Sequence, residues 1–128
     1  MKLMAVTSDQ EVLSTLREEN LPNSWNLSLV MGKVEPVDLL VKIHAFNPFA
    51  ILIDDTLFAP KTNSLLQSIR EIQKSIQIIF ITENNSIELG REISQLGIHK
   101  YFIKPFLMEH LLESIQSLET LQNKKAIY

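Results

Sequence analysis

Short apolar runs alternate along the chain with segments whose apolar residues recur every three or four positions. Short runs rich in Val, Ile, Leu and Phe favour β-strands. The third and fourth runs are apolar almost throughout, which indicates strands that are covered on both faces. The five expected strands are Lys2–Val6, Asn26–Val30, Ala50–Ile53, Gln77–Ile81 and Lys100–Ile103.

A helical pattern follows each expected strand. Ser8 and Glu11 have the spacing of a capping box, which predicts a helix that begins with Ser8 as its N-cap. Pro36 suits a first helical turn, and Gly97 suits the residue that closes a helix. The expected buried stripes are Val12, Leu13 and Leu16; Leu39, Leu40 and Ile43; Leu65, Leu66, Ile69 and Ile72; Leu89, Ile93 and Leu96; and Leu107, Leu111, Ile115 and Leu118.

Five strands in strict alternation with five helices predict an α/β fold. The expected architecture is a doubly wound parallel sheet with helices on both faces and right-handed crossovers. The length of 128 residues suits a single domain over residues 1–128. In such a sheet, ligands bind outside the carboxyl ends of the strands.

Composition narrows the classes of function. A net charge of −3 argues against direct binding of nucleic acid, which requires a basic face. The absence of cysteine excludes a disulfide scaffold and a cysteine-ligated metal, and fits a reducing cytosol. The start, MKLMAVTSD, lacks the apolar core of a secretory signal, and no run is long enough to span a membrane. We therefore expect a cytoplasmic protein.

Polar residues follow the strands at the edge where ligands are expected. The first strand leads into Thr7-Ser8-Asp9, and Asp54, Thr82 and Lys104 follow the third, fourth and fifth. A carboxylate can attack phosphorus, a hydroxyl can bond a phosphoryl oxygen, and an ammonium can neutralise its charge. By position alone, the simpler alternative is that Asp54 is a solvated carboxylate paired with Lys104.

Three segments then carry a resemblance to a known family. AILIDDT, IIFITE and LGIHKYFIKPF resemble the receiver domain of bacterial two-component response regulators, and the likeness extends over nearly the whole chain. Its most specific part is Gly97, Tyr101 and Lys104-Pro105-Phe106, with Thr82 lying 22 residues before Lys104. The resemblance implies a flavodoxin-like (βα)5 fold with strand order 2-1-3-4-5.

The resemblance also implies roles for individual residues. Asp54 matches the aspartate that accepts the phosphoryl group. Thr82 matches the hydroxyl residue that shifts toward that group, and Tyr101 the aromatic that changes rotamer with it. Lys104 matches the lysine that pairs with the acceptor carboxylate or the phosphoryl group. The bond before Pro105 is similar to one that is usually cis in the family.

The chain departs from the family where a metal is usually held. Receivers end their first strand with two acidic residues that bind Mg²⁺, and those positions are Thr7 and Ser8 in this sequence. Thr56 matches the position whose main-chain carbonyl helps to bind the metal. Because Thr7 and Ser8 carry no charge, Asp54 is the one firm charged ligand. Mg²⁺ prefers hard, charged oxygens, so we expect weak Mg²⁺ binding and slow or absent phosphorylation. A register slip would bring Asp9 nearer, but it would reverse the faces of the strand.

Some residues keep two readings. Thr7 and Ser8 are a degenerate metal site, a helix cap, or both. Strand alternation points Asp55 away from Asp54. Glu83 follows Thr82 where the family usually has a small residue, and it would obstruct access, repel phosphate or reach toward a cation.

The resemblance implies a signalling domain and not an enzyme. Its expected partners are a histidine kinase or phosphotransfer protein and a downstream signalling protein. The alternative is a pseudo-receiver, which binds partners without being switched by phosphate. An unrelated flavodoxin-like binder is disfavoured, because the segment Thr7–Gln10 offers no glycine for a phosphate loop. The residues allow, without requiring, a homodimer through the last helix and strand.

Overall fold

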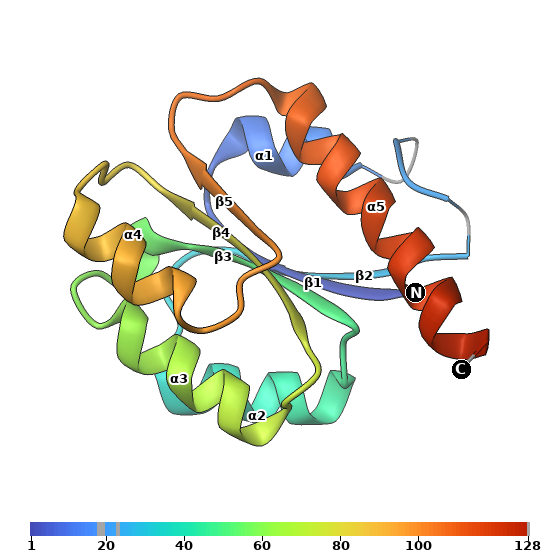
Figure 1. Ribbon diagram of the computed structural model, residues 1–128, viewed down its shortest axis with the longest axis horizontal. Coiled ribbons are helices and arrows are strands. Elements are labelled where there is room, and N and C mark those ends of the chain that lie inside the picture. Colours follow the sequence, from blue (N-terminus) through green and yellow to red (C-terminus); the bar gives the residue numbers. More distant parts are fainter. Residues whose placement is uncertain (18–19, 23, 128) are drawn as a thin grey trace.

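A parallel five-stranded sheet in the order β2-β1-β3-β4-β5 forms the centre of the computed structural model (Figure 1). The structure describes residues 1–17, 20–22 and 24–127. The strands are β1 (Lys2–Val6), β2 (Asn26–Val30), β3 (Ala50–Asp54), β4 (Gln77–Thr82) and β5 (Lys100–Ile103). The helices are α1 (Gln10–Thr15), α2 (Pro36–Phe46), α3 (Thr62–Ile72), α4 (Ile87–Ser94) and α5 (Met108–Ile127), with a 3₁₀ turn, η2 (Asp55–Leu57), directly after β3. The predicted fold class and strand order are confirmed.

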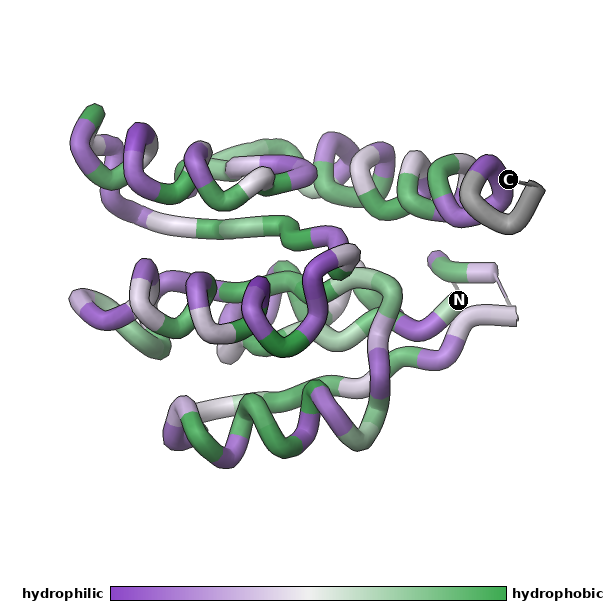
Figure 2. The backbone as a smooth tube through the Cα atoms, turned by 60° about the horizontal axis from the view of Figure 1, so that its bottom comes forward, coloured by the Kyte–Doolittle hydropathy of each residue, from purple (hydrophilic) through white to green (hydrophobic). Residues whose placement is uncertain are grey.

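The helices lie in two layers. Helices α1 and α5 cover one face of the sheet, and α2, α3 and α4 cover the other (Figure 1). Along each helix, hydrophobic and hydrophilic positions alternate, as the tube in Figure 2 shows. The apolar positions face the sheet, where their burial supplies most of the driving force for folding.

Alternation along the two central strands divides their side chains between the layers. Ile53 of β3 and Phe80 of β4 belong to the core on the α2–α3–α4 side. Leu52 and Ile81 belong to the core on the α1–α5 side. Because alternate residues of a strand face opposite layers, the position of a polar residue at the end of β3 or β4 determines which layer it faces. Even-numbered residues of β3 face the α1–α5 layer, whereas even-numbered residues of β4 face the α2–α3–α4 layer.

Three local expectations were wrong. The N-cap of α1 is Asp9 and not Ser8, because the Asp9 side chain accepts bonds from the amides of Glu11 and Val12. Leu107 was expected in the buried stripe of the last helix, but it precedes α5 and is largely exposed. Ile72, at the end of α3, is also half exposed.

Arg70 of α3 ties three segments together. Its Nε and Nη2 donate to the carbonyls of Leu96 and Gly97, just after α4. Its Nη1 donates to the carbonyls of Lys74 and Ile76, just before β4. Four main-chain carbonyls are thus satisfied by one guanidinium, whose planar fork suits several acceptors at once.

The turns that close two helices use residues in the left-handed region. Asn47 caps α2 with a φ of 52°. Gly97, expected at a helix end, has a φ of +71° and lies two residues after the C-cap Gln95 of α4. No helix in the described part of the chain is both long and apolar enough to cross a bilayer.

Candidate functional site

Asp54 lies at the carboxyl end of β3 with both of its oxygens bonded. Oδ2 accepts from Thr7 Oγ1 at 2.8 Å and from Lys104 Nζ at 3.1 Å. Oδ1 accepts from the amide and the hydroxyl of Thr56, at 3.1 and 2.9 Å. The residue is 1% exposed. The carboxylate is thus held by three hydrogen-bond donors and one ammonium, the arrangement that keeps a buried charge stable.

Lys104 bridges two carboxylates and not one. Its Nζ lies 2.8 Å from Asp9 Oδ2 and 3.1 Å from Asp54 Oδ2. Burial by itself lowers the pKa of Lys104, but the hydrogen bonds that Lys104 donates to Asp9 and Asp54, with the charges of these acids, outweigh burial and raise the pKa above its ordinary value. Lys104 therefore stays positively charged between the two acids.

Asp9 is a site residue that sequence reasoning missed. Its Oδ1 caps α1, while its Oδ2 binds Lys104. Burial by itself raises the pKa of Asp9. The hydrogen bonds donated by Lys104 and by the amides of Val12 and Glu11 lower it by more, so the pKa of Asp9 lies below its ordinary value. The strand keeps its expected register, and Asp9 enters the site from the first residues after β1.

The two hydroxyl residues at the end of β1 separate. Thr7 is buried, donates to Asp54 and accepts from the amide of Asp9 at 3.1 Å. Ser8 Oγ instead accepts from the amide of Gly32 at 2.8 Å. The structure thus brings Thr7 to Asp54 and does not bring Ser8 there.

Thr82 makes its hydrogen bond to Asp55 and not to Asp54. Thr82 Oγ1 donates to Asp55 Oδ2 at 2.8 Å, and Thr62 Oγ1 donates to Asp55 Oδ1. Ile81 is the register partner of Asp54, so Thr82 is level with Asp55 on the neighbouring strand. Thr82 and Asp55 face the α2–α3–α4 layer, whereas Asp54 faces the α1–α5 layer, so the sequence neighbours Asp54 and Asp55 have different partners.

The remaining residues named from the resemblance surround these two clusters. Tyr101 is half-buried, and its ring lies 5.2 Å from that of Phe80 between centroids. Burial raises the pKa of Tyr101, and the charge of Asp55 raises it further. Glu83 is exposed beyond the end of β4, and the Lys104–Pro105 bond is cis.

The donor set around Asp54 suits a weakly held hard cation. Lys104 shows that one positive charge is accommodated between the carboxylates of Asp9 and Asp54. These carboxylate oxygens are the ligand type that Mg²⁺ takes. The described residues nonetheless contain no group of three or more acidic, histidine or cysteine side chains placed to hold a metal. The strength of Mg²⁺ binding therefore stays a prediction from the sequence.

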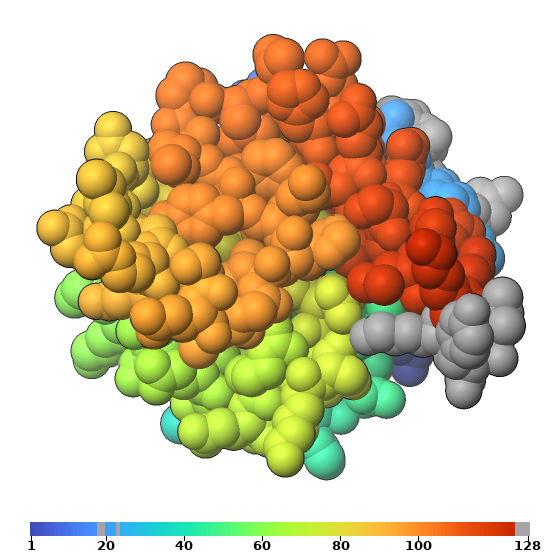
Figure 3. Space-filling model, in the orientation of Figure 1, coloured from blue at the N-terminus to red at the C-terminus, as the bar shows by residue number. Residues whose placement is uncertain are grey.

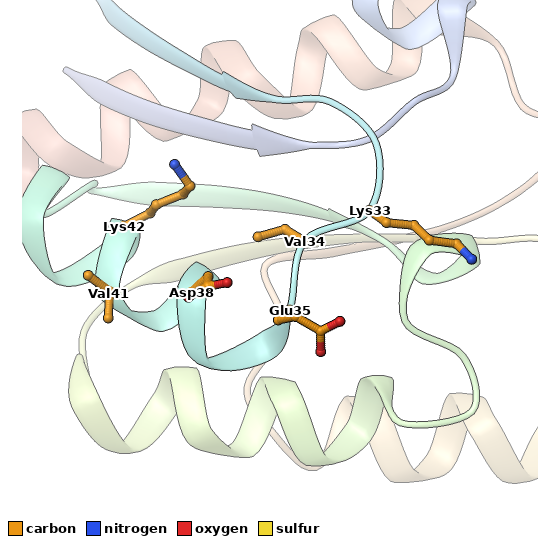
Figure 4. Close-up of a pocket in the computed structure, with 6 residues that line it drawn as sticks. All are labelled: Lys33, Val34, Glu35, Asp38, Val41 and Lys42. Carbon is orange, nitrogen blue, oxygen red and sulfur yellow. The ribbon is translucent and has the colours of Figure 1, made fainter.

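A separate hollow lies beside α2. It is lined by Lys33, Val34 and Glu35 of the loop before the helix and by Asp38, Val41 and Lys42 of the helix (Figure 4). In the close-up, the side chain of Lys33 extends away from the other labelled residues. The hollow shares no residue with the contacts of Asp54, so we do not include it in the candidate site.

Comparisons of sequence find curated response regulators. The response regulator MprA of Mycobacterium leprae is 25% identical over 120 residues, which cover 92% of this chain and 50% of that protein. MprA of Mycobacterium avium gives the same identity and coverage. The chain spans about half the length of these relatives. No family model matches the chain.

Comparisons of structure find receiver domains. A CheY-like receiver domain protein from Methanospirillum hungatei superposes with a TM-score of 0.75 and 21% identity, over 96% of this chain and 97% of the other. The receiver domain of the Francisella response regulator 1452 gives a TM-score of 0.74 and 20% identity, over 94% and 98%. Together with the curated relatives, these neighbours support the resemblance of the chain to receiver domains of response regulators, and they share its fold.

Proposed function

We propose that this domain is an atypical receiver that accepts a phosphoryl group on Asp54 and passes the signal on by protein contact. The observation that carries the proposal is the contact of Lys104 Nζ with Asp54 Oδ2 at the carboxyl edge of the sheet. A carboxylate beside a fixed ammonium combines a nucleophile with a group that stabilises charge on the transferred phosphoryl group. Asp9 adds a second carboxylate for a cation.

The transfer would use Asp54 Oδ2 as the nucleophile. Oδ2 forms a bond to phosphorus as the bond from phosphorus to the donor nitrogen or oxygen breaks, and the leaving group departs with that electron pair and takes a proton from water. The product is an acyl phosphate. Lys104 would follow the negative charge from the carboxylate to the phosphoryl oxygens, while Thr56 would keep Oδ1 in place. A bound Mg²⁺, held by Asp9, Asp54 and the carbonyl of Thr56, would supply further charge neutralisation.

The proposed donor is a histidine kinase or phosphotransfer protein in the cytoplasm. The proposed output surface is the face formed by α4, β5 and α5, which Figure 3 shows from the front. Three large apolar side chains are exposed on these elements or beside them: Ile87, Ile103 and Leu107. Exposed apolar side chains of this kind suit contact with a downstream protein.

Intact mass after incubation with acetyl phosphate and Mg²⁺ tests the proposal. We expect one phosphate adduct on the wild type and none on Asp54→Asn, which keeps the size of the side chain. An equal adduct on both proteins, or none on a folded wild type over several hours, contradicts the assignment of Asp54. Fluorescence is a poorer assay, because Trp25 lies just before the amino end of β2, whereas Asp54 lies at the carboxyl end of β3.

Glu83 is proposed to slow this labelling by its charge at the end of β4. Glu83→Ala and Glu83→Gln should then both be labelled faster than the wild type. Labelling that is faster only in Glu83→Ala would assign the effect to the size of the side chain. Rates equal to that of the wild type in both variants would remove Glu83 from the site.

A second candidate function is the pseudo-receiver, which binds partners without being switched by phosphate. The observation that favours it is the bond of Thr82 to Asp55, because this threonine was expected to respond to Asp54. A folded wild type that takes no phosphate while it still binds a partner would support this candidate.

A further inference from the structure

Asp55 is a buried carboxylate that the proposed phosphoryl transfer does not use. It is 7% exposed, and its two oxygens accept from the hydroxyls of Thr62 and Thr82. Thr62 begins α3 and Thr82 ends β4, so this carboxylate joins two elements to the end of β3. The structure gives it no ion pair among the described residues. A buried charge with two hydroxyl partners is costly, which points to a purpose beyond simple solvation.

The single donor proton of the Thr82 hydroxyl is already used in this arrangement. The hydroxyl donates its proton to Asp55 and accepts from the amide of Asn84 at 3.0 Å. A threonine hydroxyl has one proton, so Thr82 cannot donate to a group on Asp54 while the bond to Asp55 stands. Thr82 is also wholly buried, which restricts rotation of its side chain.

Tyr101 lies in the same neighbourhood. Its ring packs on Phe80, two residues before Thr82 on β4. A Cβ placed on Gly90 of α4 would lie 4.0 Å from the Tyr101 hydroxyl oxygen. That hydroxyl is buried and has no hydrogen-bond partner among the described residues. Tyr101 therefore connects the surroundings of Asp55 and Thr82 to α4 by packing alone.

We infer that Asp55 is a positioning residue that holds Thr82 and Tyr101 in one arrangement, whatever the chemical state of Asp54. The bond from Thr82 to Asp55 fixes the end of β4 on the α2–α3–α4 side of the sheet, and Tyr101 stays packed against Phe80 beneath α4. Asp54 acts on the other side, through Thr7 and Lys104. This inference does not depend on phosphate acceptance by Asp54.

The test uses 3-fluorotyrosine and ¹⁹F NMR of the full chain. The chain has two tyrosines, so a Tyr128→Phe background leaves Tyr101 as the single reporter. Asp54→Asn and Asp55→Asn are a matched pair, because the same change is made at adjacent positions. We expect Asp55→Asn to shift or split the Tyr101 resonance and Asp54→Asn to leave it in place.

Threonine variants separate positioning from general loss of stability. Thr82→Val removes the bond to Asp55 at constant size and should reproduce the effect of Asp55→Asn. Thr82→Ser keeps the hydroxyl and should give the wild-type resonance. Thr62→Val breaks the other bond of Asp55 and should lower stability without moving the resonance.

Two results would overturn the inference. One is a Tyr101 resonance that is unmoved in both Asp55→Asn and Thr82→Val. The other is a resonance that moves as far in Asp54→Asn as in Asp55→Asn. The mass assay is independent of this test: a chain that takes no phosphate leaves the inference standing, and a Tyr101 that ignores Asp55 leaves phosphate acceptance standing.

Discussion

Because Arg70 donates four hydrogen bonds to main-chain carbonyls, we predict that its removal lowers the free energy of unfolding. In Arg70→Met the side chain keeps its apolar stem but loses every donor. The bonds to Ile76 at 2.6 Å and Leu96 at 3.2 Å are partly buried, whereas those to Lys74 and Gly97 are exposed. The two exposed carbonyls will bind water instead. The two partly buried ones will lose a charged partner that water replaces incompletely.

The expected loss follows from that division. A fully buried acceptor left unpaired costs about 1–3 kcal/mol, and these two are only partly buried, so about 1–2 kcal/mol for each lowers the free energy of unfolding of Arg70→Met by about 2–4 kcal/mol. The guanidinium itself is partly desolvated, and this burial lowers the pKa of Arg70. With a urea dependence of about 2 kcal/mol per molar, in the middle of the usual range for small proteins, the midpoint of urea unfolding should fall by about 1–2 M.

Urea unfolding followed by circular dichroism is the assay, with two comparison variants. Arg70→Lys keeps the charge but reaches fewer carbonyls at once, so its stability should fall between those of wild type and Arg70→Met. Arg91→Met is the matched control, because Arg91 is exposed on α4. Equal midpoints for Arg70→Met and Arg91→Met would refute the reasoning.

Three further predictions concern single positions. Asp9→Asn keeps the cap of α1 but loses the bridge to Lys104, and should cost about 0.5–1 kcal/mol at pH 7. The pKa of Asp9 in the folded protein is below its ordinary value of 3.8, so the loss of stability in Asp9→Asn should be complete above pH 3.8 and disappear as the pH falls through the lowered value. Acid titration of stability measures this, and a loss that persists at the lowest pH contradicts it. Thr7→Asp should be less stable than wild type without Mg²⁺ and recover about 2.7 kcal/mol at a hundredfold excess over the dissociation constant, whereas Ser8→Asp should show no such gain in thermal unfolding; equal responses would mean that the orientation of Ser8 is wrong. Asn47→Ala should lose about 1 kcal/mol in urea unfolding because of its positive φ, and Asn47→Gly should lose none; equal losses in both would exclude the backbone explanation.

The strands followed from the sequence because nearly every interior strand position is apolar, whereas their order was expected from the resemblance to receiver domains. The sequence could not settle the cap of α1, since Ser8 and Asp9 are both good N-caps. In the structure the Ser8 hydroxyl accepts a hydrogen bond from the amide of Gly32, which lies 24 residues away in the chain, and Asp9 caps the helix instead. Local pattern carries no information about such a contact.

The candidate site was predictable only in part. The placement of Lys104 beside Asp54 was expected from the resemblance, but its second partner, Asp9, depends on how the chain leaves β1. The pairing of Thr82 with Asp55 had a usable signal. Alternation already separated Asp55 from Asp54, and the same rule applied to β4 would have assigned Thr82 to the side of Asp55.

Adjacent acids that serve opposite layers allow their histories to diverge. Asp54 and Asp55 are joined by one peptide bond, yet they share no hydrogen-bond partner. A substitution beside Asp54, for example at Thr7, would remove no contact of Asp55. A lineage can therefore lose or rebuild its chemistry at one aspartate while selection on the other preserves the joint between β4 and α3. The two neighbouring aspartates can therefore change independently of each other.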